Sequence, residues 1–386
     1  MAKVRALTGN HAVSEAMRQI DPDVVACYPI TPQTELMQKF ADFYADGLVR
    51  TELICVESEH SAMSASVGAS AAGARVMTAT AANGLALMWE IVYIAASTRL
   101  PITMTVVNRA LSAPINIHCD HSDSMGCRDT GWIQLYAENS QEAYDHAIMA
   151  VRIAEHPDVL LPVMSMLDGF ILSHTMERVE ILEDEQVKAF IGDYTPLYPL
   201  LDVDNPVTYG PLDLQDYYFE HKRQQIGAME NARVVIPEIF AEYGNLSGRE
   251  FDIFERYKSD DAEVILVCLG STAGTAKVAI DELRAGGIKA GLVKLRVFRP
   301  FPHGELVEAL SGARAIAVLD RSASFGAEGG PIHAEIRSAL YGRTDIPVYD
   351  YIYGLGGRNI FVDDIKNVIN LALEGKAGEM NYIGVR

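Results

Sequence analysis

The first 180 residues alternate between short apolar runs rich in β-branched residues and segments with the composition of helices. Neighbouring parallel strands need a long crossover connection, which is usually a helix. The alternation therefore predicts an α/β fold, with a parallel sheet covered by helices on both faces. The predicted strands are residues 24–30, 53–58, 74–80, 101–108 and 159–167.

The segments between these strands carry helix signals. Residues 31–35 look like a helix start, with a proline early and an acid in the first turn. Residues 60–73 are mostly Ala, Ser and Gly, so a helix there can approach a neighbour closely. We expect residues 85–97 to form an apolar, buried helix, and residues 141–156 to form a helix that ends before Pro157.

The rest of the chain divides in two. Residues 181–261 carry many prolines, tyrosines and acids around one helical segment at 216–241, and we interpret them as an extended arm and linker. A second α/β unit begins at Ala262. Its predicted strands are 262–271, 289–298, 315–321 and 346–354, and its predicted helices are 275–285 and 332–341. The expected domains are thus 1–180, 181–261 and 262–386.

The charge balance limits the partners. The chain has 32 Lys and Arg against 52 Asp and Glu, a net charge of −20. Such an acidic surface disfavours nucleic acid and anionic membranes as partners. The longest apolar stretch, 84–97, is interrupted by Glu90 and is shorter than the ~20 residues that span a bilayer. The first residues lack the apolar core of a secretory signal, so we expect a cytoplasmic protein.

The five cysteines form no C-x-x-C pair. An odd number of cysteines without this spacing predicts neither a disulfide framework nor a metal or iron–sulfur site built by this chain alone. The surroundings, such as VVACYP and LICVES, are apolar, so these thiols are expected to be small buried side chains.

Polar clusters follow three of the predicted strands: residues 28–32, 57–60 and 108–110. Ligands of open parallel sheets bind at the carboxyl ends of the strands, so Thr31, Glu59 and Arg109 could converge on one site. Each also has a structural interpretation. Thr31 could cap a helix, Glu59 could be a helix acid favoured by the dipole, and Arg109 could be an ion-pair partner.

Several motifs tie the chain to a known family. The segments YPITP, ESEHSAMSASVGASAAGARVMTAT and VVNRALSAPINIHCDHSD are followed in order by RDTGWIQLYAENSQEAYDH, LDGFILSH, LRVFRPFP, DRSASFG and YGLGGRN. Over nearly its whole length the chain resembles the alpha subunit of the pyruvate (2-oxoacid):ferredoxin oxidoreductases. The resemblance implies a thiamine-diphosphate-binding fold of the pyrimidine type, plus a smaller transketolase C-terminal-like α/β domain used mainly in assembly.

The resemblance also implies a reaction. It is the coenzyme A-dependent oxidative decarboxylation of a 2-oxoacid, pyruvate first, with branched-chain 2-oxoacids and aryl glyoxylates as alternatives. Thiamine diphosphate would be shared with a beta subunit that holds the diphosphate and Mg²⁺, in keeping with the absence of a GDG…N-type signature here. Gamma- and delta-type subunits would carry 4Fe-4S clusters, coenzyme A would be the co-substrate, and ferredoxin would accept electrons through the complex.

Family roles then fall on particular residues. Glu59 matches the carboxylate that bonds the pyrimidine ring, with Glu57 as the alternative on the same face of a strand. Thr31 would donate to the 2-oxo oxygen, and Arg109 would pair with the substrate carboxylate. Tyr28, Pro29 and Ile30 would lie against the cofactor. No metal ligand is expected in this chain.

Other segments carry weaker signals. Residues 120–123 could gate the site or be structural, and His121 is a less favoured general base because the cofactor performs its own proton transfer. The run 80–85 departs from the family's Thr-Ser-Ser-Gln-Gly, which puts side-chain contacts of Ala82 and Asn83 in doubt.

Two further functions stay open at this point. Residues 270–274 follow a strand and open a helix, where N–H groups can hold an anion, so a nucleotide-dependent dehydrogenase is one alternative. The segment is not G-x-G-x-x-G, which weakens that reading. A non-catalytic scaffold is the other alternative. The glycines at 326–330 and 354–357 are interpreted as packing turns.

Overall fold

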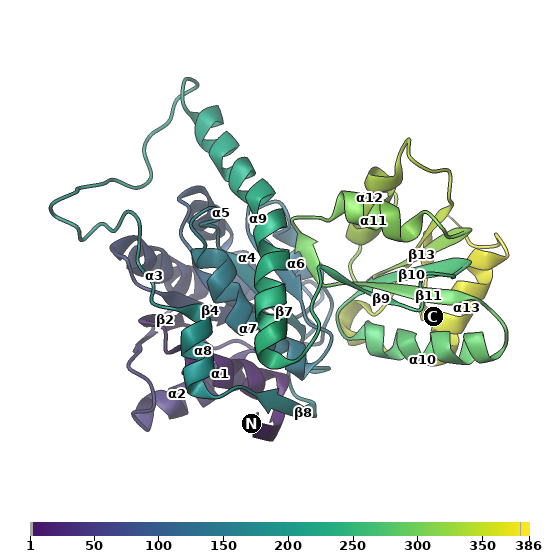
Figure 1. Cartoon of the computed structure of the whole chain (residues 1–386), viewed down its shortest axis with the longest axis horizontal. Helices are drawn as coiled ribbons and strands as arrows, with labels where there is room; N and C mark the ends of the chain where they lie inside the picture. The colour runs from purple at the N-terminus through teal and green to yellow at the C-terminus, as the bar shows by residue number, and fades with distance from the viewer. Residues whose placement is uncertain (1–2, 379) are drawn as a thin grey trace.

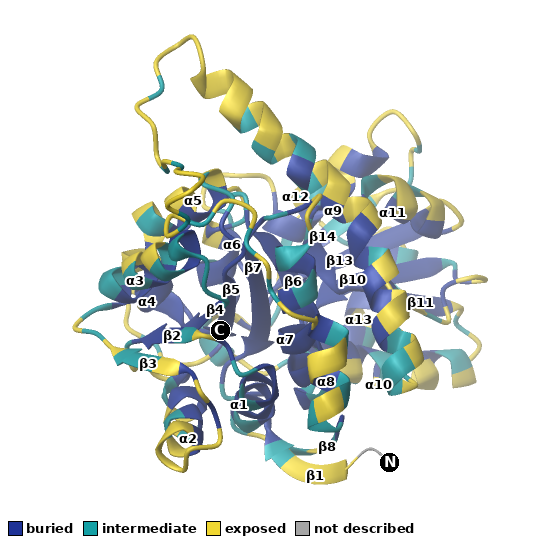
Figure 2. Cartoon of the chain, turned by 60° about the vertical axis from the view of Figure 1, so that its left-hand side comes forward, coloured by how far each residue is buried: buried dark blue, intermediate teal, exposed yellow. Residues whose placement is uncertain are grey.

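The computed structural model describes residues 3–378 and 380–386. Two α/β units lie side by side, each built around its own sheet, and a long helix with an extended segment projects from the first (Figure 1). The expected α/β fold is confirmed. The central strands of both sheets are buried, whereas the strands Lys3–Thr8 and Glu52–Cys55 and the projecting segment are largely exposed or half-buried (Figure 2).

The first unit contains a seven-stranded sheet in the order β12-β6-β7-β5-β4-β2-β3. Six of these strands are parallel, and β12, which comes from the second unit, pairs antiparallel with β6. All five strands predicted for this unit are present. The strands are β2 (Val24–Cys27), β3 (Glu52–Cys55), β4 (Val76–Thr80), β5 (Thr103–Asn108), β6 (Ile133–Tyr136), β7 (Val163–Asp168) and β12 (Val297–Arg299).

Helices cover both faces of this sheet. One apolar core joins the helices α1, α2 and α7 to one face, and a second core joins α3, α4 and α5 to the other. The helices are α1 (Gly9–Ile20), α2 (Thr34–Ala45), α3 (Glu59–Ala72), α4 (Ala82–Leu87), α5 (Trp89–Ser97), α6 (Ser122–Gly126) and α7 (Ser140–Glu155).

The expected buried helix at 85–97 is wrong in two respects. The segment forms two helices, α4 and α5, that meet at Met88. Their outer side is apolar but exposed, since Leu87, Trp89 and Tyr93 keep 50%, 40% and 37% of their surface open. The high hydrophobicity of this segment therefore reflects an uncovered apolar face.

Residues 176–247 wrap the first unit. Strand β8 (Met176–Ile181) pairs antiparallel with β1 (Lys3–Thr8), and the short helix α8 (Asp184–Ile191) follows. The segment 193–217 has no regular secondary structure, and α9 (Tyr218–Ser247) extends six residues beyond the predicted 216–241. The second half of α9 is held by α7, because its buried side chains, such as Ile236 and Phe240, join the core around that helix.

The second unit contains a six-stranded sheet in the order β15-β14-β13-β10-β11-β9, parallel except for β9. Its strands are β9 (Phe254–Tyr257), β10 (Val264–Leu269), β11 (Ala290–Leu295), β13 (Ala315–Asp320), β14 (Val348–Ile352) and β15 (Met380–Tyr382). Its helices are α10 (Thr272–Ala285), α11 (His303–Leu310), α12 (Pro331–Leu340) and α13 (Val362–Leu373), with a 3₁₀ turn at Leu355–Gly357.

The single strand predicted at 289–298 is two strands in two sheets. Strand β11 belongs to the second sheet, and β12 begins only two residues after it and pairs with β6 of the first. The chain turns at Arg296, whose guanidinium is buried and 2.8 Å from Glu142 of α7. The apolar pattern continues across this turn because both strands are buried.

Buried charges hold the two units together beside this crossing. Lys294 of β11 is 1% exposed and lies 2.7 Å from Glu142 and 2.9 Å from Glu138. Burial alone would raise the pKa of Glu142, but Arg296 and Lys294 hold it well below its usual range. These carboxylates, together with Glu255, therefore pair with cations of the protein and are poor candidates for a metal site.

Across residues 3–378 and 380–386, the structure contains no helix with the length and apolar character needed to cross a membrane.

Candidate functional site at the strand ends

Arg109 and Thr31 meet at the carboxyl edge of the first sheet. Arg109 directly follows β5, and Thr31 lies three residues before α2. The Arg109 guanidinium donates from Nη1 to the Thr31 carbonyl at 2.9 Å and from Nε to the Asn116 carbonyl at 3.0 Å. Arg109 is 7% exposed, yet Nη2 has no hydrogen-bond partner among the residues that the structure describes. A fixed, desolvated guanidinium with free donors suits a carboxylate.

Thr31 does not cap the helix that follows it. Helix α2 begins at Thr34, and its N-cap residue is Gln33, whose side chain accepts from Ile30 N at 3.2 Å. Thr31 itself is exposed. Its hydroxyl is thus free of the structural role that the sequence left open, and its carbonyl fixes Arg109.

Glu59 and Glu57 differ sharply in environment. Neither lies on a strand, because β3 ends at Cys55 and Glu59 is the first residue of α3, after the N-cap Ser58. Glu59 is 7% exposed. Glu57 is exposed and accepts a hydrogen bond from the Ser61 hydroxyl, which lowers the pKa of Glu57. The expectation that both acids share one face of a strand is wrong, and only Glu59 is turned into the protein.

Glu59, Thr80 and Gly84 lie together in a buried cluster that we call the cradle. A Cβ placed on Gly84 of α4 would lie 2.8 Å from Glu59 Oε1 and 2.5 Å from the Thr80 hydroxyl oxygen. The Thr80 hydroxyl is buried and has no hydrogen-bond partner within the described part of the chain. A side chain at position 84 would therefore displace Glu59 or Thr80, and the unpaired Thr80 hydroxyl is the kind of buried group that a polar ligand can satisfy.

Asp123, which the sequence left between gating and structure, holds the backbone of this site. Its carboxylate accepts from Ala82 N at 3.0 Å, Arg109 N at 3.0 Å and the Asn108 side chain at 2.8 Å. Burial raises the pKa of Asp123 to about 6. The contact to Ala82, whose φ is +40°, is made by the main chain, so the departure from the family's sequence at 80–85 leaves it intact.

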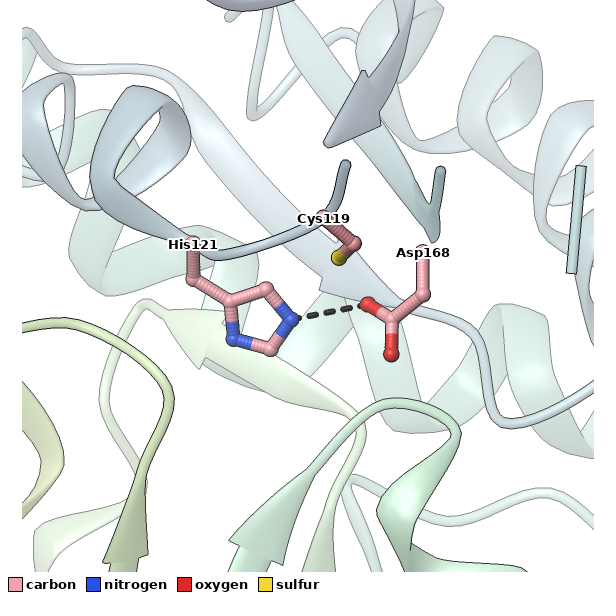
Figure 3. Close-up of side chains that lie close together, drawn as sticks. All are labelled: Cys119, His121 and Asp168. Atoms are coloured by element: carbon pink, nitrogen blue, oxygen red, sulfur yellow. Dashed lines mark hydrogen bonds and ion pairs between the residues drawn. The ribbon is translucent and has the colours of Figure 1, made fainter. Parts of the chain in front are cut away.

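Asp168 at the end of β7 binds the second unit. It lies 2.8 Å from His121 Nε2 (Figure 3). Its other oxygen accepts from Arg321 Nη1 at 2.8 Å and from Ser271 N at 3.1 Å. Burial alone would raise the pKa of Asp168, but His121 and Arg321 hold it well below its usual range. A paired His121 in the interior is a poor general base, as the sequence had suggested.

This network also occupies the glycine segment at 270–274. The main chain at Ser271, where the anion of a nucleotide would bind, already holds the Asp168 carboxylate, and a Cβ on Gly270 would lie 3.0 Å from its oxygens. The dehydrogenase alternative is therefore disfavoured. Cys119 lies beside His121 and Asp168, but burial raises the pKa of its thiol, and Arg321 already supplies the positive charge that a metal would bring.

The remaining predicted site residues lie between these groups. Tyr28 and Ile30 are half-buried and Pro29 is exposed, all on the segment that leads from β2 to Thr31. Within the described chain, the structure gives no hydrogen bond between Glu59 and either Thr31 or Arg109. Sequence reasoning missed Asn116 and the particular contacts of Asp123 and Asp168; for residues 120–123 it left only the choice between gating and structure.

Two family models match the chain. One, described as the thiamine diphosphate-binding domain of pyruvate flavodoxin/ferredoxin oxidoreductase, matches residues 15–241, which is more than half of the chain. The other, described as pyruvate:ferredoxin oxidoreductase core domain II, matches residues 262–365. Fold and site together define a subunit of the thiamine diphosphate-binding oxidoreductases. The chain belongs to the pyruvate flavodoxin/ferredoxin oxidoreductase family.

The chain aligns with curated relatives over nearly its whole length. It is 61% identical to the pyruvate synthase subunit PorA of Thermotoga maritima, over 99% of this chain and 98% of the relative. It is 45% identical to the ketoisovalerate oxidoreductase subunit VorA of Pyrococcus abyssi, over 94% and 92%. A structure of 2-oxoglutarate:ferredoxin oxidoreductase from Magnetococcus marinus has a TM-score of 0.75 at 19% identity. That match covers 96% of this chain but only 65% of the other, and it supports the fold alone.

Gly84 gives a direct test of the cradle. Gly84→Ala places a methyl group against Glu59 and Thr80, and such overpacking typically costs about 1–3 kcal/mol. We expect the variant complex to bind thiamine diphosphate about tenfold or more weakly, measured by titrating the cofactor-depleted enzyme. Gly68→Ala on α3, where a Cβ meets nothing within 4 Å, is the matched control. Equal cofactor affinity in both variants would contradict the cradle.

Proposed function

We propose that the chain is the alpha subunit of a pyruvate:ferredoxin oxidoreductase and supplies the pyrimidine half of a shared thiamine diphosphate site. The observation that carries the proposal is Arg109, a nearly buried guanidinium fixed by two main-chain carbonyls, with donors left free beside the exposed Thr31. A bidentate site of this kind fits the carboxylate that every 2-oxoacid carries.

The residues around Glu59 fit the cofactor. When bound, thiamine diphosphate supplies a nucleophilic carbon that can attack the carbonyl of a 2-oxoacid. Glu59 is placed to hydrogen-bond the pyrimidine ring and hold a proton on its nitrogen, because it is buried and has no competing partner in the described chain. Glu57 is less suited, since it is exposed and already bonded to Ser61.

Arg109 and Thr31 contact different groups of the substrate. Arg109 binds and orients the carboxylate that leaves as carbon dioxide, and the Thr31 hydroxyl donates to the 2-oxo oxygen as negative charge develops there. The segment Tyr28–Ile30 lines the cofactor side of the same pocket. These roles need the exposed face of Thr31 to be covered by a partner subunit.

The partners follow from the incomplete site. A beta subunit would provide the diphosphate and Mg²⁺ half, and gamma- and delta-type subunits would carry the 4Fe-4S clusters that pass electrons to ferredoxin. Coenzyme A would accept the acyl group. A cytoplasmic location, expected from the sequence, belongs to the same proposal.

Pyruvate is the favoured substrate because the 61% identical relative is a pyruvate synthase subunit. The 45% identity to a ketoisovalerate oxidoreductase subunit favours a branched-chain 2-oxoacid as the second candidate. Aryl glyoxylates, which the sequence also allowed, have no comparable support.

We also propose that residues 193–217 are an arm that covers a partner subunit. The segment is largely exposed (Figure 2). Its apolar side chains Leu201, Val203 and Leu212 have 75%, 86% and 89% of their surface exposed. The arm contains five Asp and no Lys or Arg. A partner surface that matches it is apolar and edged by basic groups. The division of the chain into 1–180, 181–261 and 262–386 belongs to the same proposal.

Glu59→Gln tests the cofactor role. The amide keeps the shape but cannot hold the proton on the ring, so proton exchange at the reactive carbon of thiamine diphosphate should slow about 10²–10⁴-fold. Exchange is measured by NMR after acid quench of the assembled enzyme, with Glu57→Gln as the matched control. If proton exchange is slow in the Glu57→Gln variant and normal in the Glu59→Gln variant, the role belongs to Glu57.

Steady-state kinetics should distinguish the role of Arg109 from that of Thr31. Arg109→Lys keeps the charge but loses the fork, so KM for the 2-oxoacid should rise several-fold. Arg109→Met leaves the carboxylate unpaired, which costs about 2–5 kcal/mol in kcat/KM. Thr31→Val keeps the carbonyl that fixes Arg109, so KM should stay constant while kcat falls about 10²-fold.

Steady-state kinetics of the assembled enzyme decide between these outcomes, with the KM values of coenzyme A and ferredoxin as internal controls. If Arg109→Met leaves kcat/KM for the 2-oxoacid unchanged, the carboxylate is bound elsewhere.

Limited proteolysis tests whether residues 193–217, the proposed arm, contact a partner subunit. In the isolated chain, residues 193–217 lack regular structure and expose large apolar side chains, so they should be cleaved first. In the complex, the same sites should be protected at least about tenfold, as judged by mass spectrometry of limited digests. Equal cleavage rates with and without partner subunits would contradict the arm.

A further inference from the structure

The 3₁₀ turn Leu355–Gly357 of the second unit touches the segment that holds Arg109. The Asn116 side chain donates to the Gly356 carbonyl at 2.9 Å, and Gly356 N donates to Asp120 at 3.1 Å. Both main-chain groups of Gly356 are therefore used by the loop that follows β5. This turn belongs to the motif YGLGGRN, for which the proposed function gives no role.

The turn can approach so closely because it is made of glycines. A Cβ on Gly357, where φ is +82°, would lie 2.3 Å from His118 Cβ. A Cβ on Gly356, where φ is +61°, would lie 2.5 Å from Asn116 Nδ2. Any side chain at either position would push residues 116–118 away, in addition to the backbone strain. The glycines thus serve this contact as well as the turn.

Asn116 links the turn to the guanidinium. Its main-chain carbonyl accepts from Arg109 Nε at 3.0 Å, and its side-chain oxygen accepts from His118 N at 2.7 Å. The His118 carbonyl in turn accepts from Ala110 N at 3.0 Å, which closes the loop beside Arg109. Most of the segment 112–118 is exposed, and Asn116 is half-buried, so these bonds determine where its carbonyl lies.

We propose that Asn116 is a positioning residue through which the second unit sets the direction of the Arg109 guanidinium. Nε and Nη1 are bonded to Asn116 and Thr31, and these two bonds fix the plane in which Nη2 is presented. Without the bond to Gly356, the Asn116 carbonyl loses its anchor and the guanidinium loses one of its two supports. The inference rests on the proposed role of Arg109 in binding the 2-oxoacid.

The test uses Asn116→Ala and Asn116→Asp in the assembled enzyme. Alanine removes both side-chain bonds. Aspartate keeps an acceptor for His118 N but has no donor for the Gly356 carbonyl, so it removes the bond from residue 116 to Gly356 and adds a negative charge. Both variants should raise KM for the 2-oxoacid about five- to tenfold, with kcat and the KM of coenzyme A unchanged. Asn231→Ala, which removes an asparagine-to-carbonyl bond at Asp158, is the matched control and should behave as wild type.

A double-mutant cycle with Arg109→Met completes the test. If Asn116 acts through the guanidinium, Asn116→Ala should change KM less than about twofold once Arg109 is gone. Additive effects, or an Asn116→Asp enzyme with wild-type KM, would overturn the inference. If Arg109→Met itself leaves KM unchanged, the proposed substrate role fails. If Arg109→Met raises KM and Asn116→Ala does not, that role stands and the positioning inference alone is wrong.

Discussion

The arrangement of the two units depends on one buried carboxylate, Asp168. It lies at the end of β7, and it binds His121 from the first unit and Arg321 and Ser271 from the second. An uncompensated charge in this position would cost several kcal/mol, so the three segments must close around it together. The sheet edge that carries Thr31 and Arg109 is thereby brought against the second unit, and the loop after β5 is held between them.

The proposed site has a buried part and an open part. Its deep part, around Glu59, Thr80 and Gly84, is complete and mostly buried, whereas Thr31 and the apolar sides of α4 and α5 are open. The proposed function requires a partner subunit to cover Thr31, and the exposed apolar groups of α4, α5 and residues 193–217 offer a surface for such a contact.

The sequence predicted the parts of the molecule that depend on local pattern. Strands β2, β4, β5 and β7 are buried, mostly apolar runs, and the rule for parallel sheets placed Thr31 and Arg109 at one edge. What escaped prediction depends on contacts distant in sequence. The predicted strand 289–298 enters two sheets because the chain turns at Arg296, and its sequence carries no turn signal there. Asn116 contacts Arg109 through its main-chain carbonyl, a group that every residue type carries, and Trp89 looks like a core residue although 40% of its surface is exposed.

The crossing of β12 into the first sheet has a consequence for how the chain is made. During synthesis, β6 leaves the ribosome some 160 residues before the strand that covers it, residues 297–299. Until then β6 is an unpaired edge with open main-chain groups, the kind of surface on which strands of other molecules can add. The sheet of the first unit therefore lacks one edge strand until residues 297–299 are made. A fragment that stops after α9 would keep β6 as an unpaired, aggregation-prone edge strand.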